Sequence, residues 1–185
     1  MSGLESPPVT IRDADPLRDA TACAAIYAPA VERSVTSFEL SAPAPEEIAA
    51  RMRRYQATHP WLVAERGGEV VGYAYACRFN ERPAYRWSAS VSVYVGAGER
   101  GQGRGRALYE QLFARLRRQG FRMACAGITL PNPASVGLHE ALGFRPIGIN
   151  REIGWKQGRW LDVGWWQLEL APAPAGAPAE PLAPG

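Results

Sequence analysis

A turn rich in glycine and arginine is the part of this sequence best suited to hold an anion. Its glycines and arginines are interleaved: Arg100, Gly101, Gly103, Arg104, Gly105 and Arg106. Glycine lets the backbone approach a ligand closely, and the first amides of a helix that follows have no partner within that helix. These amides, the helix dipole and the fixed positive charge together favour a phosphate or pyrophosphate group.

The spacing of these glycines excludes two common phosphate-binding loops. A Walker loop requires a lysine followed by serine or threonine, and the sequence has no such pair. A dinucleotide fingerprint requires GxGxxG and an acidic residue at the end of the next strand, where this chain has Gly127, Ile128 and Thr129. The plainest alternative is a solvated basic turn in which the glycines supply only flexibility.

A strand before the turn and a helix after it must position these groups. Valines alternate with polar residues at the end of residues 87–95, which predicts a strand there. Apolar residues recur at helical spacing over residues 104–119, and Gly120 follows as a C-cap. A buried strand over residues 121–129 comes next, and a right-handed crossover makes it parallel to the first strand.

The other elements complete an α/β order of β-αα-βββ-α-β-α-ββ. Asp15 and Pro16 predict a helix start, and Pro29 closes that helix near residue 28. Gly67 and Gly68 predict a hairpin turn. The remaining expected elements are strands at 9–12, 61–65, 69–77, 144–152 and 162–170, helices at 46–58 and 134–142, and a turn over 154–160.

Composition favours one ordinary globular domain. We expect a flexible leader over residues 1–8, a single domain over 9–170 and a disordered tail rich in proline and alanine over 171–185. The net charge of +3 is small, but seven arginines fall between Arg100 and Arg122, which suits a small polyanion better than nucleic acid. No stretch predicts a signal peptide or a membrane span.

Cysteine usage favours a reducing compartment. Cys23, Cys77 and Cys125 are far apart, odd in number and set among apolar residues, which predicts buried thiols and a cytoplasmic protein. Neither they nor His59 and His139 have the spacing of metal ligands, so we expect no metal site.

The pattern RxxGxG, from Arg100 to Gly105, resembles the acyl-CoA signature of the GNAT N-acetyltransferase superfamily. The segment from Asn132 to Phe144 resembles its second signature. The resemblance implies the GNAT fold, with a central mixed β-sheet flanked by helices, and acetyl-CoA as co-substrate. It implies cofactor contacts at Val93, Val95, Arg100, Gly101, Gly103, Arg104, Gly105, Arg106, Asn132 and Ser135.

Several long blocks narrow the resemblance further. PWLVAERGGEVVGYAYA, GITLPNPASVGLHEALGF and GRWLDVGWWQLEL are similar to phosphinothricin and methionine sulfoximine N-acetyltransferases. This implies a small amino-acid-like amine as acceptor, with Phe38, Arg82 and Tyr85 at pocket positions. The subfamily's lysine two residues before that arginine is Asn80 here, which weakens the case for phosphinothricin itself.

The resemblance also implies catalytic roles. His139 stands where the family usually has the tyrosine that protonates the departing thiolate, although a lone histidine in a helix is more often structural. The central strand should splay from its neighbour, so that a backbone amide near Tyr94 or Val95 polarises the thioester carbonyl.

One position departs from the subfamily. Ser90 stands where the subfamily has a glutamate taken as the general base, and a serine hydroxyl is a poor proton acceptor at neutral pH. The base could come from His139, Glu39 or Glu152, the amine could arrive neutral, or acetylation of this class of substrate could be weak.

Two other functions stay open on the sequence. A non-catalytic acyl-CoA-binding module would keep Arg100 and its glycines while losing the acid–base groups. An enzyme acting on a different amine, such as a protein N-terminus or an antibiotic, would keep both the arginine–glycine turn and the acid–base groups. Trp155, Trp160, Trp165 and Trp166 are expected in the core or in a subunit contact, and relatives pair through this end of the chain, so we expect a homodimer.

Overall fold

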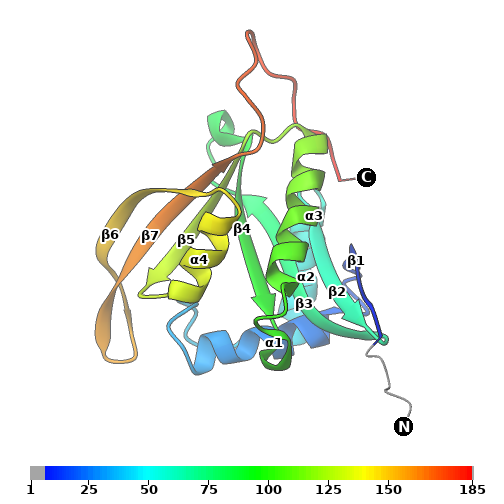
Figure 1. Ribbon diagram of the computed structural model, residues 1–185, viewed down its shortest axis with the longest axis vertical. Helices are drawn as coiled ribbons and strands as arrows, with labels where there is room; N and C mark the ends of the chain where they lie inside the picture. The colour runs from blue at the N-terminus through cyan, green and yellow to red at the C-terminus, as the bar shows by residue number, and fades with distance from the viewer. Residues whose placement is uncertain (1–6, 185) are drawn as a thin grey trace.

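The computed structural model describes residues 7–184, so most of the predicted leader lies outside the described residues. The element order matches the predicted β-αα-βββ-α-β-α-ββ, with two short 3-10 turns added (Figure 1). The elements are β1 Val9–Asp13, α1 Ala20–Glu32, α2 Pro45–Gln56, β2 Trp61–Arg66, β3 Glu69–Arg78, η1 Pro83–Tyr85, β4 Ser88–Val95, η2 Ala97–Glu99, α3 Arg104–Gln119, β5 Met123–Leu130, α4 Pro133–Ala141, β6 Arg145–Lys156 and β7 Arg159–Glu169.

Seven strands form one mixed sheet in the order β1-β2-β3-β4-β5-β7-β6. Every neighbouring pair is antiparallel except β4 and β5, which are parallel as predicted. The β4–β5 ladder holds only from Ser88 to Ser90 on β4. Beyond Ser90, β4 pairs with β3 alone, so the two central strands diverge toward the start of α3.

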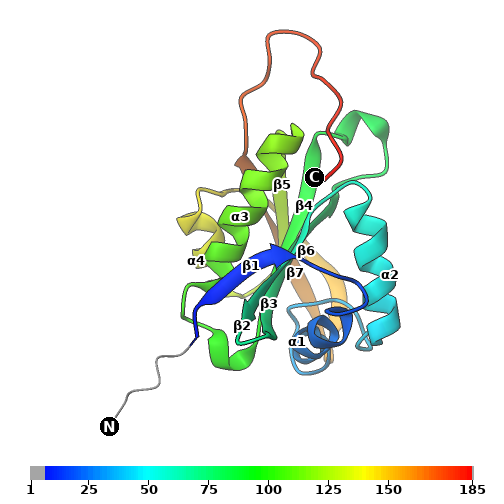
Figure 2. The same cartoon turned by 90° about the vertical axis from the view of Figure 1, so that its right-hand side faces the viewer.

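The two faces of the sheet are covered by different helices. Figure 2 shows α3 and α4 on one face and α1 and α2 on the other. Alternation along β2 explains the division, because Leu62 packs in the core with α3 whereas Trp61 and Val63 pack with α1 and α2. This arrangement confirms the predicted mixed sheet flanked by helices.

The first helix differs from its prediction at both ends. It begins at Ala20, because the Asp15 carboxylate accepts from the Leu17 amide at 2.8 Å and holds a turn there. It also continues through Pro29 to Glu32. Proline lacks a donor, but its carbonyl still accepts from the Arg33 amide at 3.1 Å, so the last turn persists.

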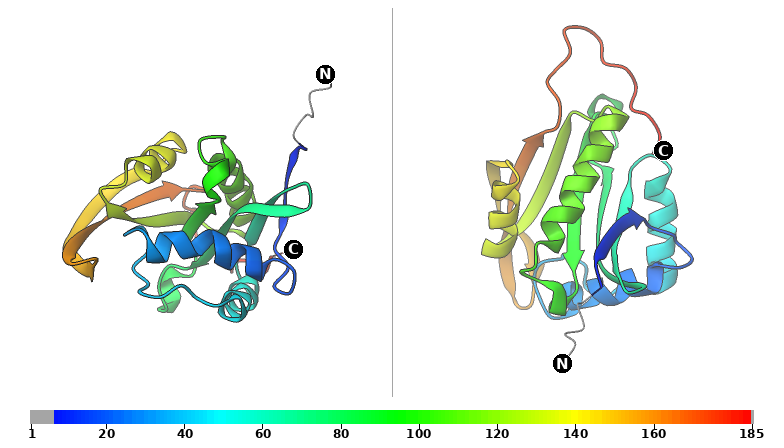
Figure 3. Two further views of the ribbon diagram at one scale, coloured as in Figure 1. Left: turned by 90° about the horizontal axis from the view of Figure 1, so that it is seen from below. Right: turned by 45° about the vertical axis from the view of Figure 1, so that its right-hand side comes forward.

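The last hairpin is longer than predicted. Residues 154–160 were expected to form a turn, but only Gln157 and Gly158 do so, with φ of 50° and 74°. Two positive φ angles suit a two-residue hairpin turn, which lets the strands extend on both sides. The β6–β7 hairpin therefore stands at the sheet edge, as Figure 3 shows from below.

The C-terminal segment, residues 171–184, contains no helix or strand but folds back onto the domain. The Leu182 amide donates to the Gln119 carbonyl at 2.8 Å, and the Gln119 carboxamide donates to the Leu182 carbonyl at 2.7 Å. The Trp87 indole donates to the Ala179 carbonyl at 2.8 Å. The domain boundaries and the disorder of the tail stay predictions, and these contacts give the tail a defined docking place.

Candidate functional site

The divergence of β4 from β5 opens a cleft of about 1390 Å³ beside the start of α3. The segments that line it include the end of β4, the glycine–arginine turn and the start of α4. All ten positions predicted for the cofactor line this cleft, together with Tyr94: Val93, Val95, Arg100, Gly101, Gly103, Arg104, Gly105, Arg106, Asn132 and Ser135. Their predicted binding role has this geometric support.

The start of α3 has the backbone geometry of an anion site. Gly101 and Gly103 have φ of 73° and 76°, a region that side-chain-bearing residues rarely adopt, and Gly103 is the N-cap. Because glycine has no side chain, no capping group occupies the first amides of the helix, and they remain available to a ligand. Gly105 lies in the first turn, where an added Cβ would be 3.3 Å from Leu138 Cδ2 and 3.8 Å from Val95 Cγ2. The helix therefore starts close to both walls of the cleft.

The three arginines of the turn are not equivalent. Arg104 Nε lies 3.3 Å from the buried Glu99 carboxylate, which also pairs with Arg66. Arg106 contacts Glu110 at 3.3 Å and donates to the Ala141 carbonyl at 3.1 Å. Within the described part of the chain, Arg100 has only a 3.4 Å contact to the Val95 carbonyl. Arg100 is thus the guanidinium least committed to the protein itself.

The α4 side of the cleft is fixed by a helix cap. The Asn132 side chain accepts from the Ser135 amide at 3.1 Å, which is a standard N-cap contact. This bond orients both residues at the helix start, where they line the cleft.

His139 lies behind the cleft wall rather than on it. The side chain is 3% exposed and is absent from the cleft lining. Its Nδ1 lies 2.7 Å from the Ser135 carbonyl, which can only accept, so Nδ1 carries the proton. Nε2 then accepts from the Tyr109 hydroxyl at 3.1 Å. Burial lowers the pKa of His139 and the bond to Ser135 partly opposes this, so the ring is neutral near pH 7.

Ser90 sits at the point where the central strands part. It is the last β4 residue in register with β5, opposite Cys125, and it pairs with Cys77 on β3. It is partly exposed and does not line the cleft. A short hydroxyl therefore occupies the apex of the divergence.

Tyr94 connects the cleft to a buried aromatic cluster. Its ring meets Tyr27 edge-on with centroids 4.8 Å apart and lies 5.4 Å from Tyr73. Burial raises the pKa of Tyr94 well above its ordinary value, so the phenol stays protonated. Its hydroxyl can donate a hydrogen bond but cannot act as a base near neutral pH.

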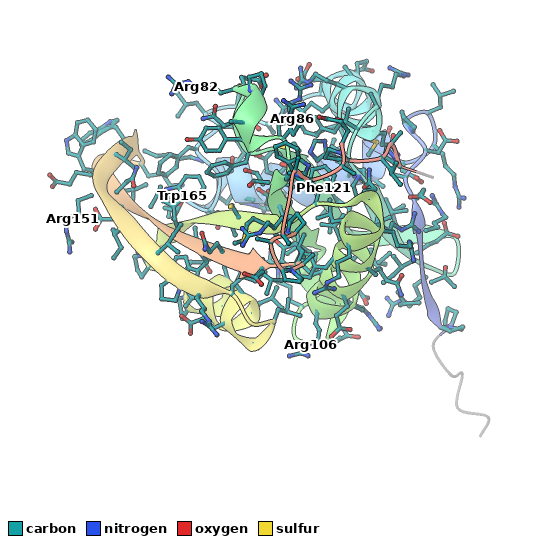
Figure 4. The ribbon with its side chains drawn as sticks, turned by 90° about the horizontal axis from the view of Figure 1, so that it is seen from above. Arg82, Arg86, Arg106, Phe121, Arg151 and Trp165 are labelled. Carbon is teal, nitrogen blue, oxygen red and sulfur yellow. The ribbon has the colours of Figure 1, made fainter. Side chains whose placement is uncertain are left out.

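The positions predicted for the acceptor are divided in space. Arg82 and Tyr85 line a second cavity of about 450 Å³, together with Arg86, Phe121 and residues 180–183 of the C-terminal segment. Figure 4 shows Arg82 and Arg86 on the side of the molecule away from Arg106. Phe38 lines neither cavity, and its ring lies against Gly154 of β6, where an added Cβ would be 2.1 Å from Phe38 Cε2.

The two carboxylates considered as bases lie in different settings. Glu39 accepts from the Tyr27 hydroxyl at 2.9 Å and pairs with Arg51 at 2.6 Å, and the Arg51 contact lowers the pKa of Glu39. A carboxylate held in this way is a weaker base. Glu152 is exposed, with φ of 48°, on the β6 bulge.

Sequence reasoning missed one wall of the cleft. The α1 helix contributes Ala22, Ile26, Pro29 and Ala30, and Arg33, Ser34 and Thr36 follow from the next loop. Small and apolar residues on a helix face carry no signal that separates a ligand wall from a core contact.

The three cysteines are free thiols, Cys23 and Cys125 buried and Cys77 partly so. Over residues 7–184, no group of three histidine, cysteine or acidic side chains is arranged to hold a metal ion. Within the same residues, no helix has the length and apolar character needed to cross a membrane.

Residues 13–165 match the family model described as an acetyltransferase (GNAT) domain. The chain is 41% identical over 171 residues to the phosphinothricin N-acetyltransferase of Streptomyces viridochromogenes, with 92% of this chain and 93% of that protein covered. It is 37% identical over 168 residues to the L-methionine sulfoximine/L-methionine sulfone acetyltransferase of Pseudomonas paraeruginosa, covering 88% and 95%. A solved GNAT superfamily phosphinothricin acetyltransferase from Sinorhizobium meliloti, in complex with AcCoA, superposes with a TM-score of 0.87 at 37% identity, covering 93% of this chain and 94% of that one.

Proposed function

The chain belongs to the GNAT acetyltransferase family, and we propose that it transfers the acetyl group of acetyl-CoA to the primary amine of a small amino-acid-like acceptor of the phosphinothricin or methionine sulfoximine type. The chain is an N-acetyltransferase, and acetyl-CoA is its co-substrate. The observation that carries the proposal is the cleft at the β4–β5 divergence, which joins a strand end, a helix start rich in arginine and the Asn132 cap in one cavity.

The donor would bind with its pyrophosphate at the start of α3. Arg100 and the amides after Gly103 supply the positive field there, while Asn132 and Ser135 lie along the other wall. The thioester would then reach the gap where β4 is no longer paired with β5. Backbone amides on the unpaired edge near Tyr94 and Val95 would stabilise the developing oxyanion.

Transfer would be direct, from thioester to amine. The amine nitrogen bonds to the carbonyl carbon and loses a proton, the carbon–sulfur bond breaks, and CoA leaves as a thiolate that takes up a proton. Ser90 is too weak a base to deprotonate an ammonium, so we propose that the amine reacts in its neutral form and that the site mainly orients it.

We propose an indirect route for any proton that His139 gives to the thiolate. Ser135 lines the cleft, and its hydroxyl oxygen lies 3.4 Å from His139 Nδ1, so this hydroxyl would give its proton to the thiolate and take the Nδ1 proton. Because the ring is neutral, Nε2 would have to take a proton in the same step from the Tyr109 hydroxyl, 3.1 Å away. Because His139 is buried, the main alternative to this proton-donating role is a structural one, in which His139 holds Ser135 and Tyr109 in place.

The acceptor would enter from the opposite side of the sheet to the donor helix. Arg82 and Tyr85 supply a guanidinium and a phenol in the second cavity, which suits an acceptor with its own acidic group. With asparagine at position 80, only one of the subfamily's two cations is present.

We also propose that the protein is a cytoplasmic homodimer. Three free thiols suit a reducing compartment. The β6–β7 hairpin at the sheet edge exposes about half or more of each of five large apolar side chains: Ile147, Ile149, Ile153, Trp155 and Trp160. By light scattering we expect the parent protein to be a dimer and the Trp155→Arg variant to be a monomer. A monomeric parent would refute the dimer.

The test of function is a thiol-release assay with acetyl-CoA, run from about pH 6 to about pH 9 against a panel of amino acids that includes phosphinothricin, methionine sulfoximine and methionine sulfone. CoA release that depends on one of these amines is the expected result. Binding of acetyl-CoA without turnover of any amine would favour the non-catalytic module. Turnover of only a peptide N-terminus or an antibiotic amine would retain the enzyme class and replace the acceptor.

A further inference from the structure

The chain contains a single lysine, Lys156, and the structure buries it. It lies at the end of β6, and its side chain is only 6% exposed. The Nζ donates to the Val31 carbonyl at 2.5 Å and to the Ser37 carbonyl at 2.7 Å. A buried ammonium is costly unless it is hydrogen-bonded, so two short bonds to carbonyls are the condition for its presence there.

These two carbonyls belong to separate parts of the chain. Val31 lies in the last turn of α1, where carbonyls lack a helical partner and favour a cation. Ser37 lies in the loop that leads to α2, and this loop also carries Phe38 and Glu39. Lys156 therefore ties the end of a helix and the middle of a loop to the last hairpin.

A second contact from β6 reaches the same loop. The Phe38 ring lies directly on Gly154, where any side chain would overlap it. Gly154 does not have a positive φ, so the need for glycine comes from this contact and not from the backbone. Phe38 remains 38% exposed, which leaves part of the side chain open to a ligand.

The rest of the loop is held by its own helices. The Tyr27 hydroxyl lies 2.6 Å from Ser37 Oγ, and it donates to Glu39 at 2.9 Å. Arg51 of α2 donates to both oxygens of the Glu39 carboxylate. The loop is thus fixed by α1 and α2 at Ser37 and Glu39, and it meets β6 at Phe38 and at the Ser37 carbonyl.

We propose that Lys156 and Gly154 are positioning residues that hold Phe38 and the loop over residues 33–39 in the conformation that binds the acceptor. The inference rests on the proposed function in one respect, because Phe38 is assigned to the acceptor by resemblance. Lys156 and Gly154 do not line the donor cleft, although Arg33, Ser34 and Thr36 at the start of the loop do. Both residues contact the loop at its Ser37–Phe38 end, so the larger effect is on acceptor binding. A preordered loop lowers the entropic cost of binding, which acts on acceptor KM.

The first test compares Lys156→Met with Arg159→Met. Arg159 is the cross-strand partner of Lys156 at the same turn but is exposed, so it is the matched control. In Lys156→Met we expect faster amide exchange over residues 33–40 and an acceptor KM raised at least about fivefold, with the acetyl-CoA KM changed less than about twofold. Lys156→Arg should recover part of the acceptor KM, and Arg159→Met should behave as the parent.

Two results would overturn the proposal: unchanged exchange over residues 33–40 in folded Lys156→Met, or equal rises in both KM values. The exchange measurement needs no turnover, so it stands even when no amino acid on the panel is acetylated. A panel on which no amino acid is acetylated would contradict the proposed function, and the exchange measurement would still test whether Lys156 positions the loop.

A second variant covers the case in which Lys156→Met does not fold. Gly154→Ala should displace the Phe38 ring and raise acceptor KM, whereas the same change made in a Phe38→Ala background should have little further effect, because the overlap is gone. Additive effects of the two substitutions would mean that Gly154 does not act through Phe38.

Discussion

Ser90 illustrates how much one residue can change in a fold that is otherwise as expected. It stands at the last paired position of β4 and β5, next to the gap in which the thioester would lie. A hydroxyl there cannot take a proton from an ammonium, so the reaction should depend on the fraction of amine that is already neutral. We therefore expect the acetylation rate of the parent protein to climb with pH.

A glutamate at this position should restore a base. In Ser90→Glu we expect the rate near pH 7 to rise by at least about tenfold and to depend less on pH. The measurement is the thiol-release rate across the pH range, with Ser90→Gln as the neutral variant of the same shape. Unchanged rate and pH profile in Ser90→Glu would mean that the position is not catalytic in this protein.

Arg100 differs from its neighbours in having no carboxylate partner among the described residues, whereas Arg104 and Arg106 each have one. We expect Arg100→Ala to weaken acetyl-CoA binding by about tenfold, as measured by calorimetry, since it removes a charge free to meet phosphate. Arg106→Ala should cost about twofold. The reverse order would show that the pyrophosphate lies further along the helix.

At the scale of elements, the start of α3 depends on glycine conformation. Gly103 has φ of 76°, where alanine is strained by about 1–2 kcal/mol. Gly103→Ala should lower the free energy of unfolding by about this amount and weaken acetyl-CoA binding, because the loop amides turn away from the ligand.

Gly98, in the neighbouring 3-10 turn, is the matched control for this substitution. Its φ is not positive and an added Cβ would meet nothing within 4 Å, so Gly98→Ala should be close to neutral in both denaturant unfolding and calorimetry. Equal losses in the two variants would mean that the φ of Gly103 is not what matters.

At the scale of the whole molecule, His59 links stability to pH. The ring is 4% exposed, packs against Phe121 with centroids 4.9 Å apart, and has no partner for Nε2 among residues 7–184. Burial lowers the pKa of His59 from 6.5 to about 4. The unfolded chain therefore binds this proton more tightly, so stability is complete above about pH 6.5 and is lost as the pH falls toward 4.

From this shift we expect the free energy of unfolding to fall by on the order of 2 kcal/mol between about pH 7.5 and about pH 5. Urea titrations at the two pH values measure it. His59→Gln should remove much of the difference, while the buried His139 contributes some of the remainder with the same sign. An identical pH dependence in His59→Gln would contradict the assignment.

The C-terminal segment is a further feature of the whole molecule. Trp87→Phe keeps an aromatic side chain but removes the indole N–H that donates to the Ala179 carbonyl. We therefore expect faster amide exchange over residues 178–184, with a change in the free energy of unfolding below about 1 kcal/mol. If exchange there is already as fast as in an unfolded chain in the parent protein, the tail is disordered, as its composition predicts.

Local rules in the sequence determined the element order, the parallel central strands and the glycine–arginine turn between β4 and α3. Gly120 caps α3 with φ of 89° as predicted, because helix length and C-cap chemistry depend on neighbours in the chain. The turn at Gln157 and Gly158 was predicted too wide, as residues 154–160, because two tryptophans and a glycine nearby obscured the strand pattern. The course of α1 through Pro29 was missed because packing overrode a local breaker.

Only the tertiary structure decided which candidate groups meet. The sequence placed Asn132 and His139 seven residues apart on one motif, yet Asn132 lines the cleft while His139 is buried behind it, since burial depends on what packs against the helix. No pattern in the sequence connects Lys156 with Ser37, which is 119 residues away in the chain, yet the Lys156 Nζ lies 2.7 Å from the Ser37 carbonyl oxygen. Contacts of this kind depend on how the sheet brings distant segments together, and no local pattern in the chain records that.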